Sequence, residues 1–202
     1  MLPTRTPALL RKLFPSLTWS IERDDASVYL TFDDGPHPEI TPWVMKELEN
    51  YGFKATFFCI GDNVRKYPET YQKILDAGHS TGNHSFNHLK GFSTSSTTYF
   101  ENIEACAKLV KSALYRPPYG QITYAQTKYL SKQYQIIMWS LLVEDWNPKL
   151  DQTKKLSLLT SETKSGDIIV FHDSEKAFEN LKVILPAYLE YLKMAGFNSA
   201  LF

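Results

Sequence analysis

The sequence Thr31-Phe32-Asp33-Asp34-Gly35-Pro36-His37-Pro38 places two adjacent carboxylates directly after a β-branched and aromatic run, Ser27 to Phe32. The run predicts a buried strand that ends at Gly35 and Pro36. Neighbouring acids at a strand end repel each other, so a metal ion, an arginine or a proton must offset their charge. An ordinary turn with solvated carboxylates explains the stretch equally well, because Asp, Gly and Pro are common turn residues. The rest of the sequence must decide between these interpretations.

Length and charge limit the possible function classes. The 202 residues fit one domain with a full core, and 22 basic residues balance 22 acidic ones. This balance indicates no nucleic acid, acidic polymer or membrane surface as partner. Cys59 and Cys106 fall in a predicted strand and a predicted helix, so we expect buried free thiols.

The first residues, Met1 to Trp19, mix basic residues and leucines with three prolines, and no apolar run is long enough for a signal-peptide core or a membrane span. We expect residues 1–26 to form a segment packed on a catalytic domain of residues 27–202, without stable membrane insertion. The expected state is a monomer in the cytoplasm. A weak interfacial anchor and export by an atypical route are the alternatives.

Apolar runs alternate with helical segments along the rest of the chain. Predicted strands cover residues 27–32, 55–60, 79–84, 114–116, 135–139, 167–171 and 197–202. Predicted helix starts lie at Thr41-Pro42, at Asp62 or Asn63, at the Thr98/Glu101 and Thr123/Gln126 capping boxes, and at Asp151. The alternation predicts a parallel sheet covered by helices, and about seven units favour a distorted or incomplete (β/α) barrel over an open doubly wound sheet.

The chemically distinctive residues all follow predicted strands, whose carboxyl ends share one face in either architecture. They are Asp33 and Asp34 after the first strand, His84 and His88 after the third, Arg116 after the fourth, Asp145 after the fifth and His172 after the sixth. His37 is expected at the rim of this site, and His79 is expected to be structural.

Two imidazoles four residues apart, His84 and His88, can point at one metal ion, although such a pair alone is more often structural. With Asp34 they supply two nitrogens and one carboxylate and leave coordination positions open. This set suits a catalytic divalent ion better than a structural one. Zinc is the first expectation, and cobalt, nickel and iron are alternatives.

The remaining residues fit the chemistry of an activated water. Asp33, whose side chain points away from that of Asp34 on an extended backbone, is a candidate base. Arg116 can orient it and keep it ionised, although an ordinary salt bridge is an equal alternative. His172 is a candidate proton donor to a leaving group, held in its tautomer by Asp145.

In chain order, five motifs resemble those of the polysaccharide deacetylases with a NodB homology domain, carbohydrate esterase family four. They are Thr31-Phe32-Asp33-Asp34, His84-Ser85-Phe86-Asn87-His88, Arg116-Pro117-Pro118-Tyr119-Gly120, Glu144-Asp145-Trp146 and Val170-Phe171-His172. The resemblance spans Ser27 to the C-terminus. It implies a distorted barrel and metal-dependent hydrolysis of an acetyl group.

The resemblance also implies residue roles. By it, Asp33 is the base, Asp34, His84 and His88 bind the metal, Arg116 orients the base, and Asp145 pairs with the acid His172. The Tyr119 backbone N–H helps to hold the oxyanion, and the substrate-binding residues are Trp146, Pro118, Val170 and Phe171. The fourth motif departs from the family pattern, with Leu142 where an Asp is common and Lys149 where an Arg is common. These departures leave the groove wall and the substrate open.

The leading hypothesis is a metal-dependent deacetylase acting on an acetylated oligo- or polysaccharide, of the chitooligosaccharide or peptidoglycan N-acetylglucosamine type. An O-acetyl esterase of the xylan type and a carbohydrate-binding pseudoenzyme are the alternatives. An iron-dependent oxygenase also uses two histidines and a carboxylate, but the alternating pattern does not fit its jelly-roll. The complete ligand triad disfavours a metal-free amidase.

Overall fold

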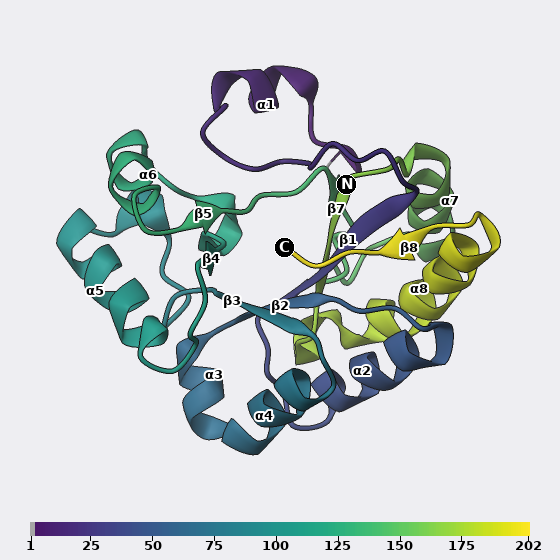
Figure 1. Ribbon diagram of the computed structural model, residues 1–202, viewed down its shortest axis with the longest axis horizontal. Helices are drawn as coiled ribbons and strands as arrows, with labels where there is room; N and C mark the ends of the chain where they lie inside the picture. The colour runs from purple at the N-terminus through teal and green to yellow at the C-terminus, as the bar shows by residue number, and fades with distance from the viewer. Residues whose placement is uncertain (1–2) are drawn as a thin grey trace.

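The computed structural model describes residues 3–202, and its centre is a curled parallel sheet (Figure 1). The strand order is β5-β4-β3-β2-β1-β7-β6, with β8 paired to β1 outside this path. The strands are β1 Ser27–Asp33, β2 Thr56–Cys59, β3 Ser80–Asn83, β4 Leu114–Tyr115, β5 Gln135–Ile136, β6 Leu141–Leu142, β7 Ile168–His172 and β8 Asn198–Ser199. The predicted incomplete barrel of about seven parallel strands is confirmed.

Helices surround the outside of the sheet (Figure 1). They are α1 Ala8–Leu13, α2 Ile40–Tyr51, α3 Gly61–Lys66, α4 Pro68–Asp76, α5 Ser96–Ala107, α6 Tyr124–Leu130, α7 Gln152–Glu162 and α8 Glu175–Met194. Every residue of β1 is buried. Its Phe32 stacks between Phe57 and Phe171, with ring centroids 5.2 and 5.5 Å away. This apolar layer fixes the central strands, whose ends carry the polar residues described below.

Several helix starts differ from the prediction. Thr41 lies inside α2, whose N-cap is Glu39, because the Thr41 hydroxyl bonds to Asp173 instead of to its own helix. The expected helix from Asp62 or Asn63 to Leu75 is two helices, α3 and α4. Its break is at Pro68, which lacks the N–H needed to continue a helix but suits a first turn.

The other helix starts are mostly as predicted. Ser95, not Thr98, caps α5, and its side chain accepts the Thr98 N–H. The Thr123/Gln126 capping box and the Asp151 cap are confirmed. The predicted strand 135–139 is shorter, and the unpredicted β6 follows β5 with no helix between them.

The N-terminal residues bridge the two edge strands, β5 and β6 (Figure 1). The Thr18 N–H donates to Ile136 O at 2.9 Å, and the Thr6 N–H donates to Ser140 O at 2.9 Å. Arg5 adds an ion pair with Asp167, Nη2 to Oδ2, at 2.7 Å. Backbone groups that two sheet edges would otherwise leave unpaired are therefore satisfied by this segment. In residues 3–202, none of the helices combines the length and hydropathy that crossing a bilayer requires.

Candidate metal centre and active site

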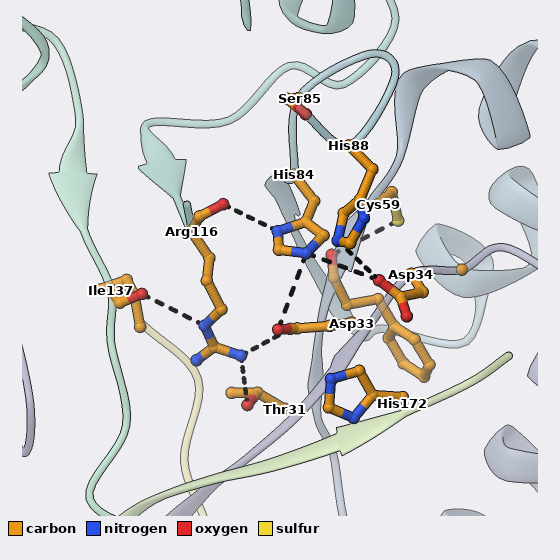
Figure 2. A network of polar contacts seen from close by, with 12 residues as sticks. Thr31, Asp33, Asp34, Cys59, His84, Ser85, His88, Arg116, Ile137 and His172 are labelled. Carbon is orange, nitrogen blue, oxygen red and sulfur yellow. Dashed lines mark hydrogen bonds and ion pairs between the residues drawn. The ribbon is translucent and has the colours of Figure 1, made fainter. Parts of the chain in front are cut away.

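Asp34, His84 and His88 meet at the carboxyl ends of β1 and β3 (Figure 2). One ligand atom of each lies within 4.8 Å of the others. Asp34 Oδ1 is 3.2 Å from His88 Nε2 and 3.7 Å from His84 Nε2. This oxygen is buried, yet no described residue forms a hydrogen bond with it. A buried carboxylate oxygen facing two imidazole nitrogens fits a divalent cation well.

The two histidines are oriented as metal ligands. His84 Nδ1 lies 2.8 Å from Arg116 O, and because a carbonyl can only accept, Nδ1 carries the proton. His84 Nε2 is thereby left with its lone pair toward Asp34. Burial, reinforced by the neighbouring His84, lowers the pKa of His88 to about 4. His88 can therefore offer a nitrogen lone pair near neutral pH, and Nε2 of His84 faces the same carboxylate oxygen.

The loops that carry these residues have unusual backbone geometry. Among the described residues, five other than glycine have left-handed φ angles: Asp34 at 79°, Ser85 at 61°, His88 at 58°, Tyr119 at 59° and Glu144 at 64°. Such conformations are strained for residues with a Cβ and collect at functional sites. All five lie in the segments after β1, β3, β4 and β6, at the candidate site.

Asp33 and Arg116 form a buried pair beside the cluster (Figure 2). Arg116 Nη1 lies 2.7 Å from Asp33 Oδ1 and donates to Thr31 Oγ1 at 2.8 Å. Backbone carbonyls accept its other N–H groups, and its guanidinium stacks 4.0 Å from the Phe58 ring centroid. Burial alone would raise the pKa of Asp33, but Arg116 holds it below its ordinary value. Asp33 is therefore a charged, oriented carboxylate, 4.0 Å from His84 Nε2.

His172 and Asp145 form a second pair across the same cavity. Asp145 Oδ1 lies 2.8 Å from His172 Nδ1, and Asp145 Oδ2 accepts the His172 N–H at 2.8 Å. Burial opposes a charged ring, but the charge and hydrogen bond of Asp145 outweigh it and raise the pKa of His172 to about 9. The edge of Trp146 packs against the imidazole, with centroids 4.7 Å apart. His172 is therefore protonated at neutral pH.

A cavity of about 350 Å³ opens between these groups. Asp33, Asp34, His84, His88, His172, Tyr119, Trp146 and Val170 all line it, together with Pro117, Gly120, Trp139, Leu142 and Lys176. Arg116 and Asp145 lie behind it and contact lining residues. The strand ends therefore bring together the residues predicted to carry the chemistry.

Two predicted pocket residues need correction. Phe171 alternates with Val170 and His172 along β7, so it points to the opposite side of the sheet, fully buried between Phe32 and Tyr188. Pro118 is buried outside the cavity, and its neighbour Pro117 lines it instead. The physical reason for the Phe171 error is the two-residue period of a strand.

The other singled-out residues lie outside the cavity. His37 Nδ1 accepts the N–H groups of Glu39 and Ile40 at 3.2 Å, so it helps to begin α2. His79 is buried, accepts the Ala55 N–H, and has its pKa lowered to about 4 by burial. Cys59 and Cys106 are buried and unpaired, as expected.

The predicted site residues did not include Asp173, a buried residue of this region, or the cavity-lining residues Trp139 and Lys176. Asp173 is completely buried, accepts the Gly35 N–H at 3.0 Å and the Thr41 hydroxyl, and donates its own N–H to Asp33 O at 3.1 Å. Burial raises its pKa to about 8. It braces the turn that presents Asp33 and Asp34. Its only signal in the sequence is an acid directly after His172 at a buried strand end.

Comparison with known proteins agrees with this geometry. The family model for polysaccharide deacetylases matches residues 20–138. A peptidoglycan-N-acetylglucosamine deacetylase of Bacillus cereus is 35% identical over 202 residues, covering 94% of either chain. A second B. cereus protein of the same name is 34% identical over 156 residues, and the match covers 74% of this chain but only 56% of the relative.

A solved structure agrees over the whole fold. The crystal structure of a peptidoglycan N-acetylglucosamine deacetylase bound to 4-naphthalen-1-yl-N-oxidanyl-benzamide superposes with a TM-score of 0.82 at 27% identity. The match covers 92% of this chain and 90% of that one. The chain therefore belongs to the polysaccharide deacetylase family, hydrolases that act on acetylated saccharides.

Proposed function

We propose that this protein is a metal-dependent deacetylase that hydrolyses the acetamide of N-acetylglucosamine units in peptidoglycan fragments or chitooligosaccharides. The observation that carries the proposal is the unpaired buried oxygen of Asp34 facing His84 and His88, between a charged aspartate and a protonated histidine. The names of the relatives support the choice of an N-acetylated glycan.

Asp34, His84 and His88 would hold one divalent ion, with zinc expected first and cobalt, nickel or iron as alternatives. Such an ion supplies Lewis acidity toward the acetyl carbonyl and lowers the pKa of a water. Three protein ligands leave open positions for these oxygens. The neutral His88 and the buried carboxylate oxygen of Asp34, which has no hydrogen-bond partner among the described residues, support this assignment.

Asp33 takes the proton of the attacking water. Its lowered pKa keeps it ionised and able to accept a proton, and the bond from Arg116 Nη1 to Oδ1 directs the other oxygen, Oδ2, toward His84. Because Arg116 is completely buried and donates four hydrogen bonds, it is held in place during turnover. Arg116 therefore acts as a positioning residue for the base.

His172 donates a proton to the departing amine. It holds that proton on Nε2, because Nδ1 is engaged by Asp145. The Tyr119 N–H finds no acceptor among residues 3–202 and lies in a segment that lines the cavity, so it can donate to the developing oxyanion. Val170 and Trp146 bound the space for the acetyl methyl group.

The decisive experiment is acetate release from chitooligosaccharides, peptidoglycan fragments and acetylated xylan, with metal-stripped and reconstituted protein. We expect release from the N-acetylated substrates only after metal is returned. Release from xylan alone would make the protein an O-acetyl esterase. Saccharide binding without acetate release under any divalent ion would make it a pseudoenzyme and refute the proposal. The cytoplasmic location and the monomeric state stay predictions, which cell fractionation and light scattering test.

A further inference from the structure

A second cavity of about 310 Å³ adjoins the catalytic one. The two share Tyr119, Gly120, Trp139 and Leu142 as lining residues. A Cβ on Gly120 would lie 2.7 Å from the Trp139 ring, so the glycine lets Trp139 pack into the shared border. The shared lining residues place the two cavities directly beside each other.

The second cavity is walled by apolar side chains from opposite sides. Leu10, Phe14, Leu17 and Trp19 come from the N-terminal segment, and Ile122 and Met138 come from the barrel. On the N-terminal side of this wall the polar side-chain groups are already used: the Thr6 hydroxyl donates to Trp139 O at 2.8 Å, and Trp19 Nε1 donates to Phe14 O at 3.0 Å. A sugar ring needs hydrogen-bond partners that this N-terminal side does not offer, whereas a hydrocarbon group needs none.

The N-terminal side of the cavity wall is held to the barrel by backbone hydrogen bonds. Its residues 3–19 precede the range matched by the family model. The Leu142 N–H donates to Thr4 O at 2.8 Å, and the Met138 N–H donates to Thr18 O at 2.7 Å. Leu10, Phe14 and Phe92 nevertheless stay 39, 41 and 67% exposed around the opening. Apolar surface left exposed on a fixed wall is typical of a ligand site.

The shared border is apolar as well. Leu142 stands there, at the position where the family pattern commonly has an aspartate. An apolar group between the two cavities would have to desolvate a carboxylate at that point, which costs free energy. A leucine side chain instead makes a favourable contact with the apolar group. The one departure of the fourth motif that lines both cavities therefore suits a hydrocarbon group.

We propose that this second cavity, the apolar annex, binds a hydrocarbon substituent carried by the acetylated saccharide. The inference rests on the proposed function for the position of the sugar. It assigns the substrate class more narrowly, to glycans that bear an alkyl or aryl aglycone.

The test compares methyl and octyl β-glycosides of N-acetylglucosamine as substrates. Burying three of the additional methylenes gives an expected KM for the octyl compound on the order of 50-fold lower. Leu10→Asp should reduce the KM ratio to below about threefold, because the carboxylate enters the annex. Leu9→Asp is the matched control: Leu9 is on the same helix but 70% exposed and outside the annex, so it should keep the full ratio.

Binding measured without turnover separates this inference from the proposed function. Calorimetry with octyl β-glucoside, which has no acetyl group, should show binding to the wild type and to Leu9→Asp but not to Leu10→Asp. This result would support the annex even if no acetate were released from any substrate. Equal KM values for the two glycosides in the wild type would overturn the proposal. An equal loss of octyl β-glucoside binding in Leu9→Asp and Leu10→Asp would overturn it as well. The wild type could also adsorb to phosphatidylglycerol vesicles, and both Leu9→Asp and Leu10→Asp could abolish this adsorption. That result would indicate that the exposed leucines bind a membrane surface, and it would overturn the proposal.

Discussion

Replacing Asp145 by asparagine tests the proposed acid most directly. The variant keeps the size of the side chain and one acceptor for the His172 N–H, but it removes the negative charge beside the ring. The difference between the ordinary pKa of 6.5 and the value of about 9 corresponds to roughly 3 kcal/mol in favour of the charged imidazole. Without the carboxylate, burial dominates, so we expect the pKa of His172 to fall to 6.5 or below.

The effect on turnover follows from the protonated fraction. At pH 8, a histidine with a pKa of about 9 is about 90% protonated, and one with a pKa of 6.5 is about 3% protonated. Because the acid must carry its proton, we expect kcat/KM at pH 8 to fall by roughly 30-fold or more. The alkaline limb of the pH profile should shift from about pH 9 to 6.5 or lower.

Two measurements check this prediction. The pH profile of kcat/KM gives the kinetic pKa, and NMR titration of His172 in the metal-free protein gives it without turnover. Asp151→Asn is the control, because asparagine caps a helix as well as aspartate, and Asp151 neither lines the cavity nor forms a hydrogen bond with Asp145 or His172. An alkaline limb that stays near pH 9 in Asp145→Asn would refute the assignment of His172 as the acid held by Asp145.

The remaining predictions concern the base, the metal and the two faces of β7. Asp33→Asn should retain metal but lose at least about 1,000-fold in kcat, measured by metal analysis beside acetate release; normal turnover would exclude Asp33 as the base. His88→Ala should weaken zinc binding by more than about 100-fold in a competition titration with a chelator, and unchanged affinity would exclude it as a ligand. Phe171→Ala should lower the free energy of unfolding by about 3–5 kcal/mol in urea, because it empties a core position. Val170→Ala should mainly change KM, and the reverse pattern would show that the strand faces are misassigned.

The sequence predicted the residues of the site better than the short strands and the side-chain directions around them. Asp33, Asp34 and His172 lie at the ends of the apolar strands β1 and β7, whose pattern is recognisable and whose ends must gather on one face. His84 follows the short polar strand β3. By contrast, β6 has two residues and no preceding helix, which is too short for any periodic signal. The two-residue alternation of a strand, which puts Phe171 on the core side of β7, could have been inferred from the sequence. A motif, however, groups consecutive residues without indicating the direction of each side chain.

Contacts between residues far apart in the sequence could not be predicted either. The bond between Thr41 and Asp173 joins residues 132 positions apart, and it redirects a hydroxyl that local rules assign to a helix cap. The pair of Lys155 and Glu144, completely or almost completely buried at 3.4 Å, has no local signature either. Interactions of this kind depend on the assembled barrel and not on any window of sequence.

The bridging of β5 and β6 by the N-terminal residues has a consequence for biosynthesis. Thr4, Thr6 and Thr18 are translated before their partners Leu142, Ser140 and Ile136, which follow more than 115 residues later. This segment can therefore seal the barrel edges only after residues 136–142 have been translated, and it must stay unpaired until then. A stall before β5 would leave a nascent sheet with open edges, the form most prone to aggregation and most in need of a chaperone.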